Sequence, residues 1–298
     1  MTDIIKRVSG REISAKDIEM IKWARKRYPC LSRSELAGTV CEILDWNTHA
    51  GHAKIQQCML LFEILEADGC VSLPPVRNKS RNGAIVRIPK YVFNEEKISG
   101  SIKEYEPIKL SIAEPGDEMK RWRAYVDRYH MLKDKWVFGS RLQYFVKSGE
   151  RELGCMQFSA SAWSLKKREE LIGWTVADRR ERLNLILNNS RFLIFPWVDI
   201  KNLASKALSL AVKRIQEDWL KIYCYEPVML ETFVDLQFFK GICYKAANWI
   251  YIGETVGAGR QSGKADTVSR KAIYIYPLQA DYKEVLRGEH EVRRVDPE

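Results

Sequence analysis

Residues 190–260 alternate between the residue patterns of strands and helices, and this alternation constrains the fold more than any other feature of the chain. Residues 191–198 form a short apolar run, which at this length favours a buried strand. From 201 to 221 apolar residues recur every fourth position, which predicts an amphipathic helix. A second apolar run covers 228–235, and a short helix that leads into a third strand follows from 239 to 253. Such an order predicts a mixed sheet with helices on its faces.

Polar residues suited to catalysis gather in the second half of this stretch. Glu231 and Asp235 lie in the second predicted strand, where alternation places both side chains on one face. Tyr244 and Asn248 lie one turn apart in the short helix, so they share a face of it. We predict that these side chains converge on a catalytic site in which Glu231 is the base and Tyr244 a proton donor. The structural alternatives are an ion pair of Glu231 with Arg260, packing of the Tyr244 ring, and a turn cap at Asn248.

The same stretch carries a family resemblance. Residues 230–235 (LETFVD), 241–249 (GICYKAANW) and 253–260 (GETVGAGR) together resemble the family of the Druantia anti-phage system protein DruA. Shorter matches follow in the family's order from residue 153 to residue 205, so the resemblance extends well beyond the stretch itself. Relatives of that family also travel with mobile elements and are often described as transposase-like. The resemblance implies a role in bacterial defence beside other defence proteins, including a helicase.

A second resemblance concerns the order of the elements. A strand, a long helix, a second strand and a tyrosine-bearing helix are similar to the central half of the GNAT acyltransferase fold. That fold holds a cofactor pyrophosphate at the start of the long helix, where free N–H groups and the helix dipole favour an anion. The resemblance implies cofactor contacts from Val198, Asn202, Ser205 and Ala207, although Ser205 stands where GNAT enzymes have a glycine. Acetyl-CoA or a related donor is the cofactor implied, and the residues themselves establish none.

The first part of the chain predicts a DNA-binding unit. Helical patterns over 14–27, 35–46 and 52–67, followed by two short apolar runs around Gly83, have the layout of a winged helix-turn-helix. The third helix would enter a DNA groove, and the basic wing would hold phosphates. A winged helix that binds protein is the alternative. The predicted nucleic-acid contacts are Lys54, Gln57, Arg77, Lys79, Arg81 and, in the later glycine-rich loop, Arg260.

These patterns divide the chain into parts. We expect an α+β protein, with an N-terminal winged helix-turn-helix domain before a GNAT-like mixed β-sheet flanked by helices. The expected parts are a winged-helix domain over 1–94, a linker over 95–106, a GNAT-like domain of the DruA type over 107–280 and a charged tail over 281–298.

The net charge indicates the kind of partner to expect, and the cysteines and histidines bear on whether disulfides or metal sites are present. The formal net charge of +10 favours a polyanion such as double- or single-stranded DNA. The 7 cysteines are odd in number and widely spaced, so we expect neither a disulfide framework nor a C-x-x-C metal site. His49 and His52 lack a nearby third ligand, so no metal is predicted there either. No apolar run approaches the roughly 20 residues of a membrane span, and we expect a cytoplasmic protein without membrane contacts.

Two functions remain open at this point. The first is a DNA-binding component of a bacterial anti-phage or mobile-element system, with a GNAT-like domain that acts at or on nucleic acid. The second is an active acyl-CoA-dependent transferase that modifies a nucleobase or a protein. The sequence has no P-loop, nuclease or Ser-His-Asp pattern, which argues against a self-sufficient transposase, helicase or hydrolase.

Overall fold

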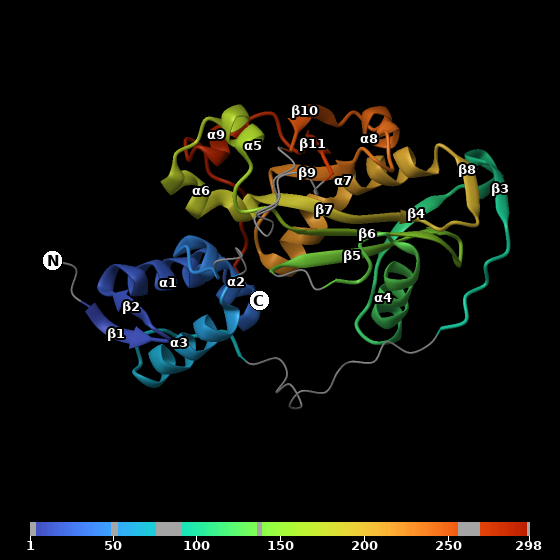
Figure 1. Ribbon diagram of the computed structural model, residues 1–298. Coiled ribbons are helices and arrows are strands. Elements are labelled where there is room, and N and C mark those ends of the chain that lie inside the picture. The colour runs from blue at the N-terminus through green and yellow to red at the C-terminus, as the bar shows by residue number, and fades with distance from the viewer. Residues whose placement is uncertain (1–3, 49–52, 76–90, 136–138, 256–268, 297–298) are drawn as a thin grey trace.

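A mixed β-sheet organises the chain, as the computed structural model shows for residues 4–48, 53–75, 91–135, 139–255 and 269–296. Within these residues a 7-stranded sheet has the order β10-β11-β9-β7-β6-β5-β4 (Figure 1). Neighbouring strands are antiparallel except β7 and β9, which run parallel. This arrangement confirms the α+β class. The strands are β4 (Ile108–Ile112), β5 (Arg141–Ser148), β6 (Arg151–Ala160), β7 (Ile186–Ile194), β9 (Met229–Asp235), β10 (Ile250–Glu254) and β11 (Lys271–Pro277).

The longest helix, α7 (Leu203–Tyr223), connects the two parallel strands, as the sequence predicts. Its buried face includes Leu208, Ile215 and Trp219, which the four-residue spacing had indicated. The helix ends where Cys224 adopts a left-handed conformation with φ 68°. The other helices around the sheet are α4 (Asp117–Tyr129), α5 (Lys166–Ile172), α6 (Val176–Arg182), α8 (Ile242–Ala246) and α9 (Tyr282–Leu286), with 3-10 turns η1 (Ile102–Tyr105) and η2 (Leu183–Leu185).

The two parallel strands separate soon after they meet. β7 pairs with β9 only from Ile186 to Asn188, although both strands continue beyond this point. On its other edge β7 has an irregular register, because Gln157 faces Arg191 while the next residue of β6 faces Asn189, so Ser190 is an extra residue. A bulge of this kind bends a strand and increases its twist. β7 ends in a turn in which the N–H of Val198 donates to the carbonyl oxygen of Phe195.

The N-terminal helices form where the sequence predicts them. Ser14 and Ser32 each accept a hydrogen bond from the third helical N–H and complete a capping box. The preceding hairpin was not predicted. Residues 71–75, predicted as the first strand of the wing, form no strand, because the segment is an irregular connection after α3. The second predicted strand and the turn before it lie within residues 76–90, outside the described part of the chain. The winged helix therefore stays a prediction. These elements are β1 (Ile4–Val8), β2 (Arg11–Ser14), α1 (Ala15–Arg27), α2 (Arg33–Ile43) and α3 (Ile55–Ala67).

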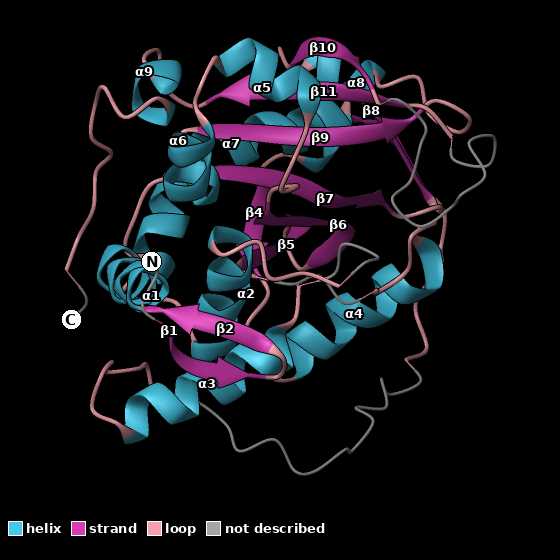
Figure 2. Cartoon of the chain, turned by 60° about the vertical axis from the view of Figure 1, so that its left-hand side comes forward, coloured by secondary structure: helices cyan, strands magenta, loops and turns pink. Residues whose placement is uncertain are grey.

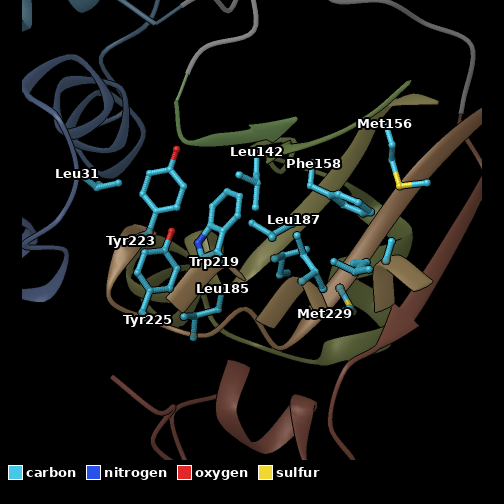
Figure 3. Close-up of a cluster of buried hydrophobic side chains, with 14 of the residues drawn as sticks. Leu31, Leu142, Met156, Phe158, Leu185, Leu187, Trp219, Tyr223, Tyr225 and Met229 are labelled. Carbon is cyan, nitrogen blue, oxygen red and sulfur yellow. The ribbon is translucent and has the colours of Figure 1, made fainter. Parts of the chain in front are cut away.

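The N-terminal helices lie together beside one end of the sheet (Figures 1 and 2), where α2 contacts α6. Leu31 belongs to the same hydrophobic cluster as Trp219, Tyr223 and Tyr225 (Figure 3). The Tyr223 hydroxyl donates to Glu35 Oε1 at 3.0 Å. The two parts therefore share one core, and nothing in this packing fixes the predicted boundary at residue 94.

A disulfide between Cys30 and Cys224 joins the loop after α1 to the end of α7. This corrects the expectation that the cysteines form no disulfide. The two residues have Cα atoms 5.9 Å apart but a sequence separation of 194, so their spacing carried no signal of the bond. Among the other described cysteines, Cys41, Cys58 and Cys155 are buried, as expected of small apolar residues.

The predicted linker and tail both contain regular structure. Residues 95–106 include β3 (Ile98–Ser101), which pairs in parallel with β8 (Val198–Lys201). Most of β3 is exposed, so it lacks the apolar alternation by which strands are recognised. In the predicted tail, Val285 and Leu286 of α9 are buried. Because both segments are polar, their sequences alone did not indicate the regular structure that they contain.

The described residues contain neither a helix that could span a membrane nor a group of side chains that could hold a metal ion. None of the helices there combines the length and apolar composition needed to cross a bilayer. Groups of His, Cys, Asp and Glu side chains arranged to hold a metal ion are also absent from this part of the chain. His49 and His52 lie outside it.

Candidate functional site

A cleft opens between β7 and β9 beyond their last paired residues. Its volume is about 650 Å³, within the usual range of ligand pockets. Its walls come from β7 (189–194), the end of β9 (232–235), the turn and helix that follow (238–244), and the segment after α4 (129–132). The bulge at Ser190 and the end of the ladder at Asn188 thus produce an open space inside the sheet.

Tyr244 lies at the floor of this cleft with its hydroxyl held by two neighbours. The hydroxyl donates to Asn189 Oδ1 at 2.7 Å and lies 3.4 Å from Thr232 Oγ1. Asn189 is itself fixed, because its amide nitrogen donates to the carbonyl oxygens of Gln157 and Arg191. Burial raises the pKa of the Tyr244 hydroxyl, so it remains protonated at neutral pH. The cleft floor therefore presents a fixed, neutral hydrogen-bond donor.

Glu231 lies on the opposite face of β9 from this group, because Thr232 is the residue that faces Tyr244. The Glu231 side chain is fully buried and forms an ion pair with Arg168 Nη1 of α5 at 2.9 Å. Its other oxygen accepts from the N–H of Ala162 at 3.1 Å. The expected structural partner was Arg260, and the partner observed is Arg168. Glu231 is thus part of a closed, paired cluster rather than a base that faces the cleft.

Asp235 and Asn248 complete the predicted catalytic set, and the structure separates them as well. Asp235 borders the cleft but accepts from Ser269 Oγ at 2.6 Å and from the N–H of Gln237 at 3.1 Å. Asn248 is exposed beyond the end of α8 with φ 62° and is not part of the cleft wall. The predicted convergence is therefore wrong: Tyr244 and Asp235 border the cleft, and Glu231 and Asn248 do not.

His130, at the end of α4, forms part of the opposite wall. Burial and the nearby Arg191 guanidinium lower the pKa of its imidazole to about 4. Its Nδ1 accepts a hydrogen bond from the N–H of Leu132 at 3.1 Å. At neutral pH the ring is therefore uncharged, and a neutral ring that accepts at Nδ1 carries its proton on Nε2.

The family comparison agrees with the resemblance seen in the sequence. A family model described as Druantia protein DruA matches residues 72–267, which include all the residues that line the cleft except Lys271. The chain belongs to the DruA family. None of the curated proteins with which it was compared gives a match.

Solved acetyltransferases resemble this DruA-family chain more distantly. A Bacillus subtilis acetyltransferase in complex with CoA has TM-score 0.38 and 8% identity, over 58% of this chain and 99% of that one. An N-acetyltransferase from Staphylococcus aureus Mu50 has TM-score 0.34 and 10% identity, over 57% and 97%. FeeM, an N-acyl amino acid synthase from uncultured soil microbes, has TM-score 0.34 and 12% identity, over 57% and 91%. Scores this low assign no function to the DruA-family chain.

The GNAT-like order expected from the sequence is present in this DruA-family chain. β7, α7, β9, α8 and β10 follow one another along the chain, with β7 and β9 parallel and Tyr244 in α8.

The predicted cofactor residues lie at the start of α7, outside the cleft wall. Val198 and Ala207 are buried, Asn202 precedes the helix in a left-handed conformation, and the Ser205 hydroxyl donates to the Asn202 carbonyl at 3.0 Å. Residues 198–207 contain no glycine, which would let a pyrophosphate approach the backbone N–H groups closely. As they stand, these residues do not fit an acyl-CoA pyrophosphate.

The predicted nucleic-acid contacts divide into described and undescribed residues. Lys54 and Gln57 border a second cavity, of about 570 Å³, between the starts of α2 and α3. The others, Arg77, Lys79, Arg81 and Arg260, lie outside the described residues.

Sequence reasoning missed the residues that shape the cleft floor. Asn189 and Thr232 hold the Tyr244 hydroxyl, while Arg168 neutralises Glu231 on the other face. A signal for Asn189 was present, because residues 188–190 are Asn-Asn-Ser within an otherwise apolar strand. Arg168 had no comparable signal, since it lies 63 residues from its partner in a charged helical segment.

Proposed function

We propose that this DruA-family protein is the DNA-binding component of a bacterial anti-phage defence or mobile-element system, and that its cleft acts at or on nucleic acid. The observation that carries the proposal is an open cleft with a buried, protonated Tyr244 at its floor. The DruA family and the net charge of +10 support a polyanionic partner. Double- or single-stranded DNA and other defence proteins, including a helicase, are the partners that follow.

The cleft offers one clear chemical capability. The Tyr244 hydroxyl donates to Asn189 Oδ1, and a ligand oxygen or nitrogen that reaches the floor would replace Asn189 as the acceptor. The cleft wall near the floor includes the apolar side chain of Phe192, and a hydrogen bond is stronger beside apolar groups than in bulk water. Tyr244 would then polarise the bound group or donate a proton to it. Asn189 and Thr232 act by positioning the hydroxyl.

The second candidate is an acyl-CoA-dependent transferase that modifies a nucleobase or a protein. The separation of the parallel strands β7 and β9 favours it, because an extended donor could lie along the unpaired part of β7. The start of α7 counts against it, because Ser205 is bonded within its own helix and the loop lacks glycine.

Two measurements test the main proposal. Fluorescence anisotropy with labelled DNA should show binding by the full chain whose strength falls steeply as salt rises. Tyr244→Phe should abolish phage protection in cells that carry the complete defence system, while DNA affinity stays close to wild type. Tyr251→Phe is the matched control, because Tyr251 is an exposed tyrosine of β10 outside the cleft wall.

The outcomes separate the candidates. A chain that binds no DNA at low salt would rule out the DNA-binding role, and full protection by Tyr244→Phe would remove the cleft from the mechanism. Calorimetry with acetyl-CoA addresses the second candidate: saturable binding that is lost in an Asn202→Ala, Ser205→Ala double variant would support the transferase.

A further inference from the structure

Exposed apolar side chains surround the mouth of the β7–β9 cleft. On the turn and helix after β9, Phe238 is 63% exposed, Phe239 55% and Ile242 66%. Across the opening, Met131 is 46% exposed and Leu132 40%. All of them border the same cleft, so they form two facing edges of one opening, which we call the rim. Exposed apolar groups gathered around a cavity indicate a binding surface.

The rim is also positively charged. Lys240 and Lys245 are exposed beside the phenylalanines, and Lys133 and Lys135 are exposed beside Met131 and Leu132. None of these lysines forms an ion pair with another described residue. Residues 236–253 contain no acidic residue, so Lys240 and Lys245 have no counter-charge in their own segment.

The neighbouring acidic groups form no ion pair with these lysines. Asp134, which lies between Lys133 and Lys135, pairs with Arg123 at 2.7 Å. Asp235 is the carboxylate of the cleft wall, and its oxygens accept hydrogen bonds from Ser269 Oγ and the N–H of Gln237. The rim therefore combines unpaired cations with accessible aromatic faces, and a polyanion with exposed planar groups complements both features.

We propose that the rim binds single-stranded nucleic acid, with unpaired bases stacked on Phe238 and Phe239 and phosphates held by Lys240 and Lys133. The inference rests on the proposed function and makes it more specific, since it names the single strand as the form recognised. Paired bases in a duplex hide their faces in the helical stack, whereas unpaired bases offer a face to an aromatic ring. The phenylalanines lie at the entrance, so a base adjacent to the stacked ones is directed toward Tyr244.

Fluorescence anisotropy of one labelled sequence, as a single strand and as its duplex, tests this with the full chain. The single strand should bind more tightly than the duplex. Replacing both rings, Phe238→Leu with Phe239→Leu, should weaken single-strand binding by about tenfold or more, because leucine keeps apolar bulk without a ring face. Tyrosine at both positions should keep the affinity within about twofold, because the ring faces remain.

The contribution of the lysines is tested by the salt dependence of single-strand binding. The Lys133→Ala, Lys240→Ala double variant should show a shallower slope when log affinity for the single strand is plotted against log salt concentration. The slope should fall by roughly 0.7 for each lost phosphate contact. Val176→Ala is the control for an exposed apolar residue away from the rim, since Val176 is 57% exposed on α6. Its binding should equal that of the wild type. The substituted rim residues are exposed, so melting temperatures should stay unchanged and confirm folding.

Several results would overturn the inference. Unchanged single-strand binding by the leucine pair would show that the rings do not stack on bases. Equal affinity for strand and duplex, together with sedimentation of the wild type on phosphatidylglycerol vesicles, would assign the rim to a membrane surface. Binding of the duplex at least as tightly as the single strand leaves the proposed function standing and removes only this inference. Failure to bind either form removes both.

Discussion

The two faces of β9 each bury polar groups, but they do so in different ways. On one face Glu231 is paired with Arg168, and both side chains are fully buried. On the other face Tyr244 is held by Asn189 and Thr232 at the floor of an open cleft. The Glu231 face is closed, whereas the Tyr244 face has room for a ligand. Burial and charge alone thus do not identify a site, and access from solvent decides between two polar clusters on one strand.

The largest effect is expected on the closed face. Arg168→Met leaves the Glu231 carboxylate buried without its cation, which should lower the free energy of unfolding by roughly 3–5 kcal/mol. Combination with Glu231→Leu should recover most of that loss, because replacing both members of a buried pair with apolar residues is often nearly neutral. Urea unfolding of the single and double variants measures both values. Wild-type stability in Arg168→Met would mean that the closed face is not held by this pair.

A smaller effect, up to about 3 kcal/mol, is expected from His130 on the wall of the open face. Its folded pKa is about 4, while an unfolded histidine titrates near pH 6.5. Between these values the unfolded chain takes up a proton that the folded chain does not, so stability is complete above about pH 6.5 and falls toward pH 4. His130→Gln should flatten this part of the stability profile in unfolding experiments at several pH values. An identical slope in the variant would show that other groups cause the loss.

The smallest effect on stability is expected at Tyr244. Tyr244→Phe removes one hydrogen bond and leaves Asn189 Oδ1 without its donor, which should cost about 1 kcal/mol. Thermal unfolding of Tyr244→Phe and Arg168→Met, measured side by side, compares the two faces of β9 directly. A loss of stability as large as that of Arg168→Met would show that Tyr244 has a structural role and that the two faces of β9 do not differ in this respect.

Much of the fold was predictable because its signals are local. The four-residue spacing of α7 and the capping serines Ser14 and Ser32 lie within a few turns of the elements they define. The β1–β2 hairpin was missed, and β3 was missed because it is mostly exposed and lacks apolar alternation. Elements with a regular apolar period along the chain were therefore found, whereas β3, which lacks one, was not.

The site was harder to predict because its grouping depends on tertiary pairing. Alternation places neighbouring residues of β9 on opposite faces, but the sequence does not say which face is covered by α5 and which is open. Arg168 closes one face across 63 residues of chain, and Asn189 meets Tyr244 across 55. Tyr244 was identified because a helix tyrosine at that place in the element order is a feature of the GNAT-like resemblance. Glu231 was chosen for its residue type, which does not reveal its burial.

The bond between Cys30 and Cys224 makes a covalent ring of everything between them, including β3 to β8 and α7. Cutting the backbone once inside this ring, for example between residues 76 and 90, leaves a nicked chain whose pieces are still one molecule. The N-terminal helices cannot then diffuse away from the sheet until a reductant opens the disulfide. A protease alone can therefore cut the backbone without releasing the N-terminal helices.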